Sequence, residues 1–330
     1  MKRSNRKPGA GPAPTLVADI GGTNARFATA IPVGERWSLT LPQTFSCEGA
    51  QGLADLLARY LASCGAAAPR EGCIAIAGPV DGPSVSVTNL GWTEHVDDLA
   101  AVCGLSRLRA MNDFAALAAG IETLSASESV ELKPGDARKA APMTVVGPGT
   151  GLGVALLLPR GSRWDCVATE GGHATFGPGN PEELALCAAL QHVHQHVSAE
   201  TLLSGRGLER IHEFLGGQSH RDAASISAAA LAGGDAHARQ AVQMFLDVLA
   251  GVAGDVALAH GATGGVWIGG GIIPRLLPLL DRSAFAARFT EKGLMRHYLE
   301  RIPVRLVIAP DVALRGVAVA YTAQRGQDRL

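Results

Sequence analysis

Residues 145–158, VVGPGTGLGVALLL, place four glycines and one threonine within seven residues, between two apolar runs. Glycine tolerates positive φ, which lets neighbouring backbone N–H groups converge on an anion. A dinucleotide-binding fingerprint would require a helix after its glycines, whereas VALLL after Gly153 is apolar and carries no helix-capping signal. The stretch therefore predicts a β-hairpin whose glycine-rich tip approaches an anionic ligand.

The same organisation occurs about 130 residues earlier in the chain. Residues 15–31, TLVADIGGTNARFATAI, are two apolar runs around Gly-Gly-Thr-Asn, which predicts another hairpin with a polar tip. A third glycine cluster, Gly269 to Gly271, follows the apolar run GGVWI, and a turn or helix is expected near Pro274. One half of the molecule therefore echoes the other at the level of motif.

The segments around these clusters indicate an α/β protein. LADLLARYLASC has the leucine spacing of an amphipathic helix, and the short buried strand GCIAIAGPV follows it. Asp113 opens an alanine-rich helix, and residues 125–142 are polar and loop-like, which favours a boundary between lobes. Further helices are expected at 181–197, where proline occupies the first position, at 237–261, and at 311–324, which could pack back on the first lobe.

Length and composition set the broad class. With 330 residues two domains are expected: a disordered leader at 1–14, a small α/β domain at 15–122 plus 312–330, and a large one at 123–311. Hydrophobic residues make up 47%, charged residues 18%, and the formal net charge is −1, so nucleic acid is not an expected partner. The absence of a signal peptide and of an uninterrupted apolar run of about 20 residues predicts a cytoplasmic protein without a membrane partner.

Cysteine and histidine usage gives no metal site. The six cysteines form no C-x-x-C pair, so reduced and mostly buried thiols are expected. His192 and His196 are spaced for one helical face, but two ligands without a third are weak evidence for a metal, and a solvated helix face is favoured.

The glycine clusters together suggest a nucleotide clamp. Two hairpin tips could offer amides to the β- and γ-phosphates from both sides, while the third strand end leaves space for a flat base. No Walker motif is present, which excludes a P-loop ATPase. Asp19 is the candidate Mg²⁺ ligand, with a turn-forming aspartate as the alternative. Thr23 and Asn24 could donate to phosphate oxygens, and Arg26 could pair with phosphate or form a surface salt bridge.

A second constellation suits a polyhydroxyl ligand. Carboxylates, an amide and an imidazole supply the mixed donors and acceptors that such a ligand needs, and the candidates are Asn112, Asp113, Glu170, His173 and Glu200. Phosphorylating an alcohol requires removal of its proton, so a carboxylate within reach is the natural base, and Asp113 is the candidate. Asp113 could instead be a helix N-cap, and EGGH (170–173) could be a turn in which His173 fills a local hydrogen bond.

Six motifs in this order resemble one family. ADIGGTNARFA, MNDFAA, GPGTGLG, EGGHATF, HVSAETLLSG and GGVWIGGGIIP are similar to the bacterial glucokinases of the actin-like ATPase (ribonuclease H-like) superfold, over residues 15 to about 325. The resemblance implies a two-lobed α/β fold with a central cleft. It implies ATP- and Mg²⁺-dependent phosphorylation of the 6-hydroxyl of glucose at the entry to glycolysis, two lobes that close over the sugar, and a homodimer. The related repressor/kinase group carries a cysteine-rich zinc motif after its histidine, and GGHATFGPGN lacks one, which favours the zinc-free branch.

The resemblance also assigns roles to residues. Asp113 matches the catalytic base, and the sugar-binding positions are matched by Asn112, Glu170, His173 and Glu200, with Asn89 nearby. The expected nucleotide-binding residues are Asp19, Gly21, Gly22, Thr23, Asn24, Arg26, Gly149, Thr150, Gly151, Gly269, Gly270 and Gly271.

Three other functions compete with this assignment. A different hexose kinase is the nearest, because motifs do not resolve the orientation of one hydroxyl. A non-catalytic sugar sensor that binds DNA is disfavoured, because no helix-turn-helix fits within the 14 residues before Thr15. An actin-like or chaperone ATPase would leave the EGGH and SAE acids without a purpose.

Overall fold

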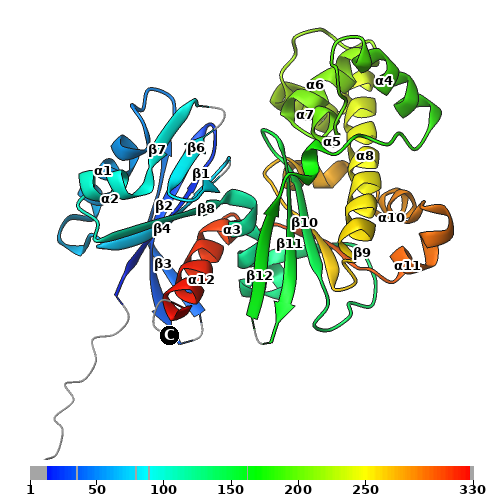
Figure 1. Cartoon of the computed structure of the whole chain (residues 1–330). Coiled ribbons are helices and arrows are strands. Elements are labelled where there is room, and N and C mark those ends of the chain that lie inside the picture. The colour runs from blue at the N-terminus through cyan, green and yellow to red at the C-terminus, as the bar shows by residue number, and fades with distance from the viewer. Residues whose placement is uncertain (1–12, 35, 79, 88–89, 162, 328–330) are drawn as a thin grey trace, which may run out of the picture. The chain divides into compact units, whose positions relative to one another are not determined.

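The computed structural model describes residues 13–34, 36–78, 80–87, 90–161 and 163–327 (Figure 1). The chain divides into two compact units, Met1–Thr123 with Asp311–Leu330, and Leu124–Pro310. Residues 1–12 of the expected leader lie outside the described residues.

The first unit is built on a five-stranded sheet in the order β3-β2-β1-β4-β8. Its strands are β1 (Thr15–Ile20), β2 (Asn24–Val33), β3 (Arg36–Ser46), β4 (Glu71–Ile76) and β8 (Arg107–Asn112). Strands β1 and β2 form the predicted hairpin, β3 extends it to an antiparallel meander, and β4 and β8 follow in parallel, β4 beside β1 and β8 beside β4. Register aligns Ile20 with Ile76 and Ile76 with Asn112, so three parallel strands end at one edge of the sheet.

Both faces of this sheet are buried, and successive residues of β1 serve opposite faces. Leu16, Ala18 and Ile20 pack in the core formed with α1 (Leu53–Cys64) and α2 (Val96–Val102). Val17 belongs to the opposite core, with α3 (Asp113–Gly120) and α12 (Val312–Gln327). This two-sided burial explains the continuous apolar run in the sequence. A small sheet completes the unit, with β5 (Val80–Asp81), β6 (Ser84–Val87) and β7 (Trp92–His95).

Helices α3 and α12 approach each other through glycines, and Figure 1 shows them side by side. A Cβ at Gly316 would overlap the carbonyl oxygen of Ala116, and a Cβ at Gly120 would overlap that of Val312. Only glycine permits such close helix contact. The C-terminal helix therefore packs on the first unit, as the sequence predicted, and supports the helix that Asp113 begins.

The second unit repeats the strand plan of the first. Its sheet has the order β12-β11-β10-β13-β14-β9. The strands are β9 (Ser129–Lys133), β10 (Met143–Pro148), β11 (Leu152–Arg160), β12 (Arg163–Thr169), β13 (Gly265–Ile268) and β14 (Val304–Val307). Strands β10, β11 and β12 form the meander, β13 and β14 add in parallel, and β9 adds an antiparallel edge. The similarity between the two hairpin motifs thus extends to the order and direction of five strands in each sheet.

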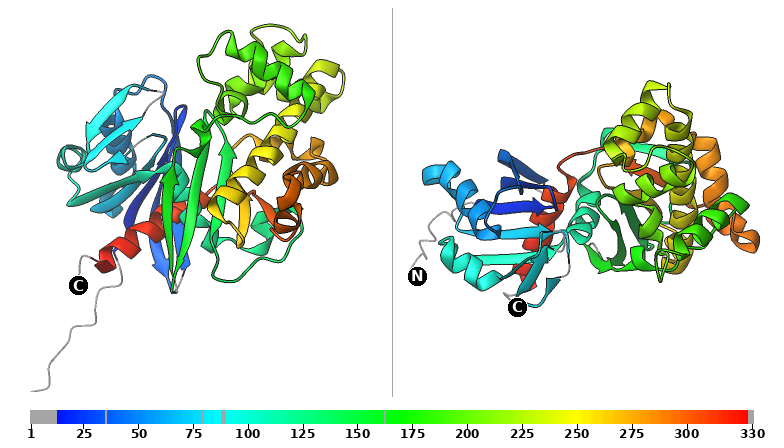
Figure 2. Two further views of the ribbon diagram at one scale, coloured as in Figure 1. Left: turned by 45° about the vertical axis from the view of Figure 1, so that its right-hand side comes forward. Right: turned by 90° about the horizontal axis from the view of Figure 1, so that it is seen from above.

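Helices make up most of the remainder of this unit (Figure 2). They are α4 (Pro181–Gln191), α5 (Ala199–Leu202), α6 (Gly205–Phe214), α7 (Ala223–Ala232), α8 (Ala236–His260), α9 (Ile273–Leu276), α10 (Arg282–Thr290) and α11 (Arg296–Glu300), with short 3₁₀ turns at Ala126–Glu128, Gly171–His173, Leu277–Leu279 and Gly293–Met295. In the first unit, 3₁₀ turns occur at Gly65–Ala67 and Ile121–Thr123. By length and composition α8 could cross a membrane, because few charges interrupt it, although it holds no uninterrupted apolar run of that length. However, 67% of its most apolar window is buried in this unit, the pattern of a core helix.

The structure corrects two expectations about local structure. Residues 125–142 are not simply a loop, because β9 pairs with β14, where Leu132 is buried and Lys133 satisfies its ammonium group with three backbone carbonyls. The helix predicted for 181–197 ends at Gln191, so His192 and His196 do not share a helical face. His196 is instead hydrogen-bonded to the hydroxyl of Thr175 at 2.9 Å.

All six cysteines are free, and four of them are buried. This confirms the expectation of reduced and mostly buried thiols.

Candidate functional site

The glycine tip between β1 and β2 is held by three of its own carbonyl groups and one of its N–H groups. The Gly21 N–H donates to the carbonyl of Asn24 at 3.0 Å, and the Cys47 N–H donates to the carbonyl of Thr23 at 2.9 Å. The Cys47 thiol adds a contact to the Gly21 carbonyl at 3.4 Å. The side chains of Thr23 and Asn24 are exposed. The tip therefore has a fixed backbone and presents polar side chains to a ligand.

Asp19 lies in β1 next to this tip, directly opposite Arg26 of β2. The Arg26 Nη1 and Asp19 Oδ2 atoms are 3.9 Å apart. Because Asp19 is a strand residue paired across the hairpin, the alternative of a turn-forming aspartate is wrong. Burial raises the pKa of the Asp19 carboxyl, and the positive charge of Arg26 opposes that rise. A carboxylate that burial disfavours in this way gains from a cation brought close to it.

Asn112 and Asp113 lie where β8 ends and α3 begins. The Asn112 Oδ1 accepts the N–H groups of Phe114 and Ala115 at 2.9 and 3.1 Å, and its Nδ2 donates to the carbonyl of Gly78 at 3.4 Å. Asn112 is therefore the N-cap, which corrects the alternative that Asp113 has this role. Asp113 is the first residue of the helix and half-buried, and its Oδ1 accepts the N–H of Phe114 at 2.9 Å.

The sheet brings these two groups of the first unit to one edge. Ile20, just before the glycine tip, is aligned through Ile76 with Asn112, just before Asp113. Neighbouring strands lie about 4.8 Å apart, so the two strand ends are separated by roughly 10 Å. The predicted phosphate tip and the predicted base thus belong to the same edge, at a spacing that a phosphate chain and a sugar hydroxyl could bridge.

In the second unit, the tip between β10 and β11 is equally constrained. The Gly149 N–H donates to the carbonyl of Gly151 at 2.7 Å, and the Gly149 carbonyl accepts the N–H of Gly205 at 2.9 Å. Thr150 lies at its apex and is exposed. The tip is therefore tied to the first residue of α6.

The third glycine cluster packs against this hairpin. The Gly269 N–H donates to the carbonyl of Val146 at 2.9 Å. A Cβ on Gly147 would overlap the backbone of Gly269, and Gly270 has φ +83° with its missing Cβ directed at the carbonyl of Pro148. The two loops therefore touch backbone to backbone, while Gly149 and Gly271 have no atom within 4 Å of a missing Cβ.

The acids and the histidine predicted for sugar binding gather in one cluster of the second unit. The His173 Nε2 lies 3.7 Å from Glu170 Oε2, and His173 Nδ1 lies 4.0 Å from Glu200 Oε1. Gly171–His173 forms a 3₁₀ turn, as the alternative for this segment proposed, but the turn also aims the imidazole at both acids. The side chains of Glu170 and His173 are more than half exposed. The cluster offers two carboxylates and an imidazole to a ligand.

Glu200 also connects this cluster to the glycine tip. Its Oε2 accepts the backbone N–H of Leu152 at 2.8 Å, immediately after Gly151. A Cβ on Gly151 would collide with the same carboxylate. Among the described residues no group of three or more acids, histidines and cysteines is arranged to hold a metal ion.

The predicted residues therefore form two groups, one in each unit. The first unit carries Asp19, the tip with Arg26, Asn112 and Asp113, and the second carries the remaining candidates. Asn89 lies outside the described residues. Sequence reasoning missed Cys47 and Gly205, which hold the two tips, because their partners are distant in the chain and no local pattern marks them.

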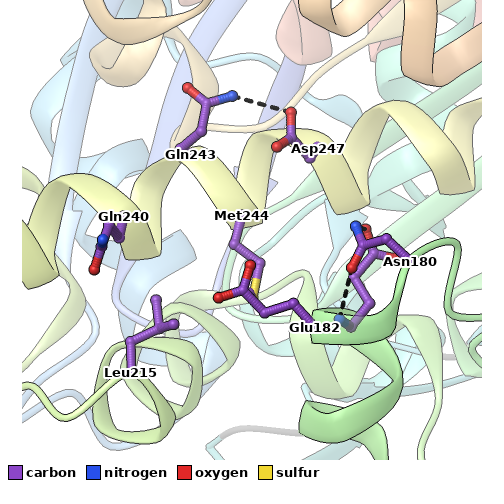
Figure 3. Close-up of a pocket in the computed structure, with 8 residues that line it drawn as sticks. Asn180, Glu182, Leu215, Gln240, Gln243, Met244 and Asp247 are labelled. Atoms are coloured by element: carbon purple, nitrogen blue, oxygen red, sulfur yellow. Dashed lines mark hydrogen bonds between the residues drawn. The ribbon is translucent and has the colours of Figure 1, made fainter.

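A separate polar hollow of the second unit involves none of the predicted residues. Figure 3 shows Met244 pointing from α8 toward Glu182 and Asn180, while Gln243 donates to Asp247 along the same helix at 3.0 Å. The lining residues are Asn180, Glu182, Glu183, Leu215, Gln240, Gln243, Met244 and Asp247. Glu183 is fully buried and paired with Arg288 at 2.9 Å, so it serves the packing of α4 on α10.

Comparisons with known proteins identify the family of the chain. A family model described as Glucokinase matches residues 16–324. A glucokinase of Chromobacterium violaceum is 40% identical over 310 residues, covering 92% of this chain and 88% of that protein. A glucokinase of Saccharophagus degradans is 37% identical over 311 residues, covering 92% and 97%.

Solved structures show the same fold. The crystal structure of a glucokinase from an Antarctic psychrotroph superposes with a TM-score of 0.83 at 35% identity, covering 94% of this chain and 99% of that one. A glucokinase of Balamuthia mandrillaris, crystallised with glucose, has a TM-score of 0.77 at 21% identity over 94% of each chain, which supports the fold alone. With the family model matched over nearly its whole length, the chain belongs to the glucokinase family and has the actin-like ATPase fold.

Proposed function

We propose that this protein transfers the γ-phosphoryl group of ATP to the 6-hydroxyl of D-glucose, giving glucose 6-phosphate and ADP. The observation that carries the proposal is the common sheet edge of the first unit, where the carboxylate of Asp113 and the Gly21–Asn24 tip follow aligned strand ends. A base and a phosphate site on one rigid edge suit an alcohol kinase.

Asp113 is the proposed general base. As the bond between the sugar oxygen and phosphorus forms and the bond from phosphorus to the ADP oxygen breaks, the hydroxyl proton passes to the Asp113 carboxylate. The carboxylate is partly exposed, and the N-cap of α3 is Asn112 and not Asp113. Both facts support a chemical role.

The proposed sugar ligands are Asn112, Glu170, His173 and Glu200, together with Asn89. The amide of Asn112 donates only a 3.4 Å hydrogen bond to Gly78, so one of its two N–H groups is available for a sugar oxygen. The two acids accept hydroxyl protons, and the imidazole between them can donate or accept.

ATP and Mg²⁺ fit the residues that would hold them. Gly149 and Gly271 have no atom within 4 Å of a missing Cβ, and Gly147 and Pro148, just before the 149–151 tip, lie backbone to backbone with Gly269 and Gly270. Asp19 would hold Mg²⁺ with few other protein ligands, as is usual when phosphates and water complete the coordination. When bound, the ion neutralises phosphate charge. Thr23, Asn24 and Arg26 would donate to the phosphate oxygens.

The same proposal makes the protein a cytoplasmic homodimer that acts at the entry to glycolysis. The net charge of −1 supports small-molecule substrates over nucleic acid.

ADP production from ATP and Mg²⁺ with a panel of hexoses tests the function. We expect rapid turnover with glucose, slower turnover with its epimers, and only background ADP without sugar. A faster rate with another hexose would reassign the substrate within the kinase class. Equal ADP production with and without sugar would indicate an ATPase and contradict the proposal.

A further inference from the structure

The carboxylate of Glu200 faces two different parts of the second unit. One oxygen, Oε2, accepts the N–H of Leu152 at 2.8 Å, and this residue directly follows the Gly149–Gly151 tip. The other oxygen, Oε1, lies 4.0 Å from His173 Nδ1 in the predicted sugar cluster. One side chain therefore touches both the expected phosphate loop and the expected sugar subsite.

The backbone around Glu200 reinforces both connections. On the phosphate side, the Gly149 carbonyl accepts the N–H of Gly205 at 2.9 Å, so the tip is anchored at its first residue and, through Leu152, directly after its last. On the sugar side, the Ala199 N–H donates to the carbonyl of Ala174 at 2.9 Å, next to His173. The short helix α5 is thus held between the two subsites, and Glu200 is its residue that reaches both.

The Glu200 carboxylate packs closely against the backbone of Gly151. A Cβ there would collide with the Glu200 carboxylate, so the tip backbone rests directly on this side chain. With 32% of the Glu200 side chain exposed, a ligand can still reach it. A movement of the carboxylate therefore changes the support of the tip.

We propose that Glu200 couples sugar binding to nucleotide binding by holding the Gly149–Gly151 tip through the Leu152 N–H. This inference rests on the proposed function, in which a glucose hydroxyl donates to Glu200. That hydroxyl fixes the carboxylate in one orientation, and the fixed carboxylate keeps its hydrogen bond to Leu152. The tip is then ordered before the nucleotide arrives, so less conformational entropy is lost on nucleotide binding. Coupling of this kind is reciprocal and typically changes affinity about 5- to 150-fold.

A residue that only binds sugar would behave differently. Its removal would weaken glucose binding and leave the nucleotide affinity of the sugar-free protein unchanged. A positioning residue for the tip must change that affinity even when no sugar is present. The sugar-free nucleotide affinity is therefore the decisive quantity.

Calorimetric titration of the full chain with a non-hydrolysable ATP analogue and Mg²⁺, with and without glucose, measures this quantity. For Glu200→Ala we expect the sugar-free protein to bind the analogue roughly fivefold or more weakly than the wild type, because the tip loses its support. Glucose should not tighten analogue binding by this variant. Glu200→Gln keeps an oxygen acceptor for the Leu152 N–H, so its sugar-free affinity should stay near that of the wild type. His173→Ala is the matched control, which should weaken glucose binding and leave sugar-free analogue binding unchanged.

If the alanine variant fails to fold, Glu200→Asp replaces it. Its carboxylate is one methylene too short to keep the Leu152 contact, so its sugar-free affinity for the analogue should also fall. Wild-type affinity for the analogue in sugar-free Glu200→Asp or Glu200→Ala would overturn the coupling. The coupling would also be overturned if glucose did not change the affinity of the wild type for the analogue. In that case, glucose-dependent ADP production would still support the proposed function. No analogue binding by the wild type would contradict both.

Discussion

Asn112 and Asp113 have different roles at the start of α3: Asn112 is the helix N-cap, and Asp113 is the proposed general base. The Asn112 side chain caps the helix by accepting two N–H groups of its first turn, and the Asp113 carboxylate adds one hydrogen bond from the Phe114 N–H. Asp113 is the first residue of α3 and directly follows the last residue of β8. This division makes the proposed base testable without loss of the fold.

Asp113→Asn should lower kcat for glucose phosphorylation by about 10²-fold or more, because the amide cannot take the hydroxyl proton. Glucose affinity should change much less, since the amide still forms hydrogen bonds. Steady-state kinetics with a glucose titration measures both quantities, and thermal unfolding should show a melting temperature close to the wild type. Near-normal turnover would remove Asp113 from the role of base.

The carboxyl group of Asp19 links stability to the proposed metal site. Burial raises the pKa of Asp19 in the folded state, and Arg26 offsets this only partly. The folded protein therefore holds this proton more tightly than the unfolded chain, and stability falls as pH rises from the ordinary aspartate value of about 4 through the raised value. The penalty is therefore present at neutral pH, above the ordinary aspartate value.

Asp19→Asn should accordingly be more stable than the wild type at pH 7 in the absence of Mg²⁺ and nucleotide. The gain should shrink as the pH is lowered toward 4, where both proteins carry an uncharged group. Its kinase activity should fall by about 10²-fold, because the proposed Mg²⁺ ligand is lost. Urea unfolding at several pH values tests the first statement, and a stability gain that is absent at pH 7 would contradict it.

At the scale of elements, the two glycine loops of the second unit depend on close backbone contact. Gly147 and Gly270 lie where β10 and β13 end, and each occupies a place where a side chain would overlap the other loop. Strand pairing of β10 with β13 sets this distance, so the loops are a consequence of the sheet. The neighbouring Gly271 has no atom within 4 Å of its missing Cβ and provides a matched comparison.

Gly270→Ala should lower the free energy of unfolding by about 1–3 kcal/mol, because φ is +83° and the new Cβ overlaps Pro148. It should also weaken binding of the ATP analogue. Gly271→Ala should change stability by no more than about 0.5 kcal/mol. Denaturant unfolding of both variants measures this difference, and equal stabilities would show that the loops are not packed as described.

At the scale of the whole molecule, much of the fold could be predicted from the sequence because its signals are local. The two hairpins, the strand before Gly269, and the helices that begin at Leu53 and Pro181 follow from apolar spacing and turn residues. Strand β9 was missed because SVELK is short and polar, and its pairing with β14 joins residues about 170 positions apart. The helix end at Gln191 was missed because the histidine run carries no helix-breaking residue.

The site could be predicted only as sets of residues. Motifs grouped Glu170, His173 and Glu200, and these side chains do gather, but their catalytic and binding roles stay predictions. The contacts that hold the loops were not predictable, since the Cys47 thiol reaches Gly21 and the Glu200 carboxylate reaches Leu152 across long sequence separations. Such contacts are set by how sheets and helices pack, which no local pattern encodes.

Phosphorus NMR of the products formed from ATP, Mg²⁺ and glucose tests the central claim most directly. The account predicts a phosphate ester on the 6-oxygen of glucose in an amount equal to the ADP formed, and neither ADP nor ester above background with 6-deoxyglucose. Inorganic phosphate in place of the sugar ester, or an ester formed on 6-deoxyglucose, would contradict it.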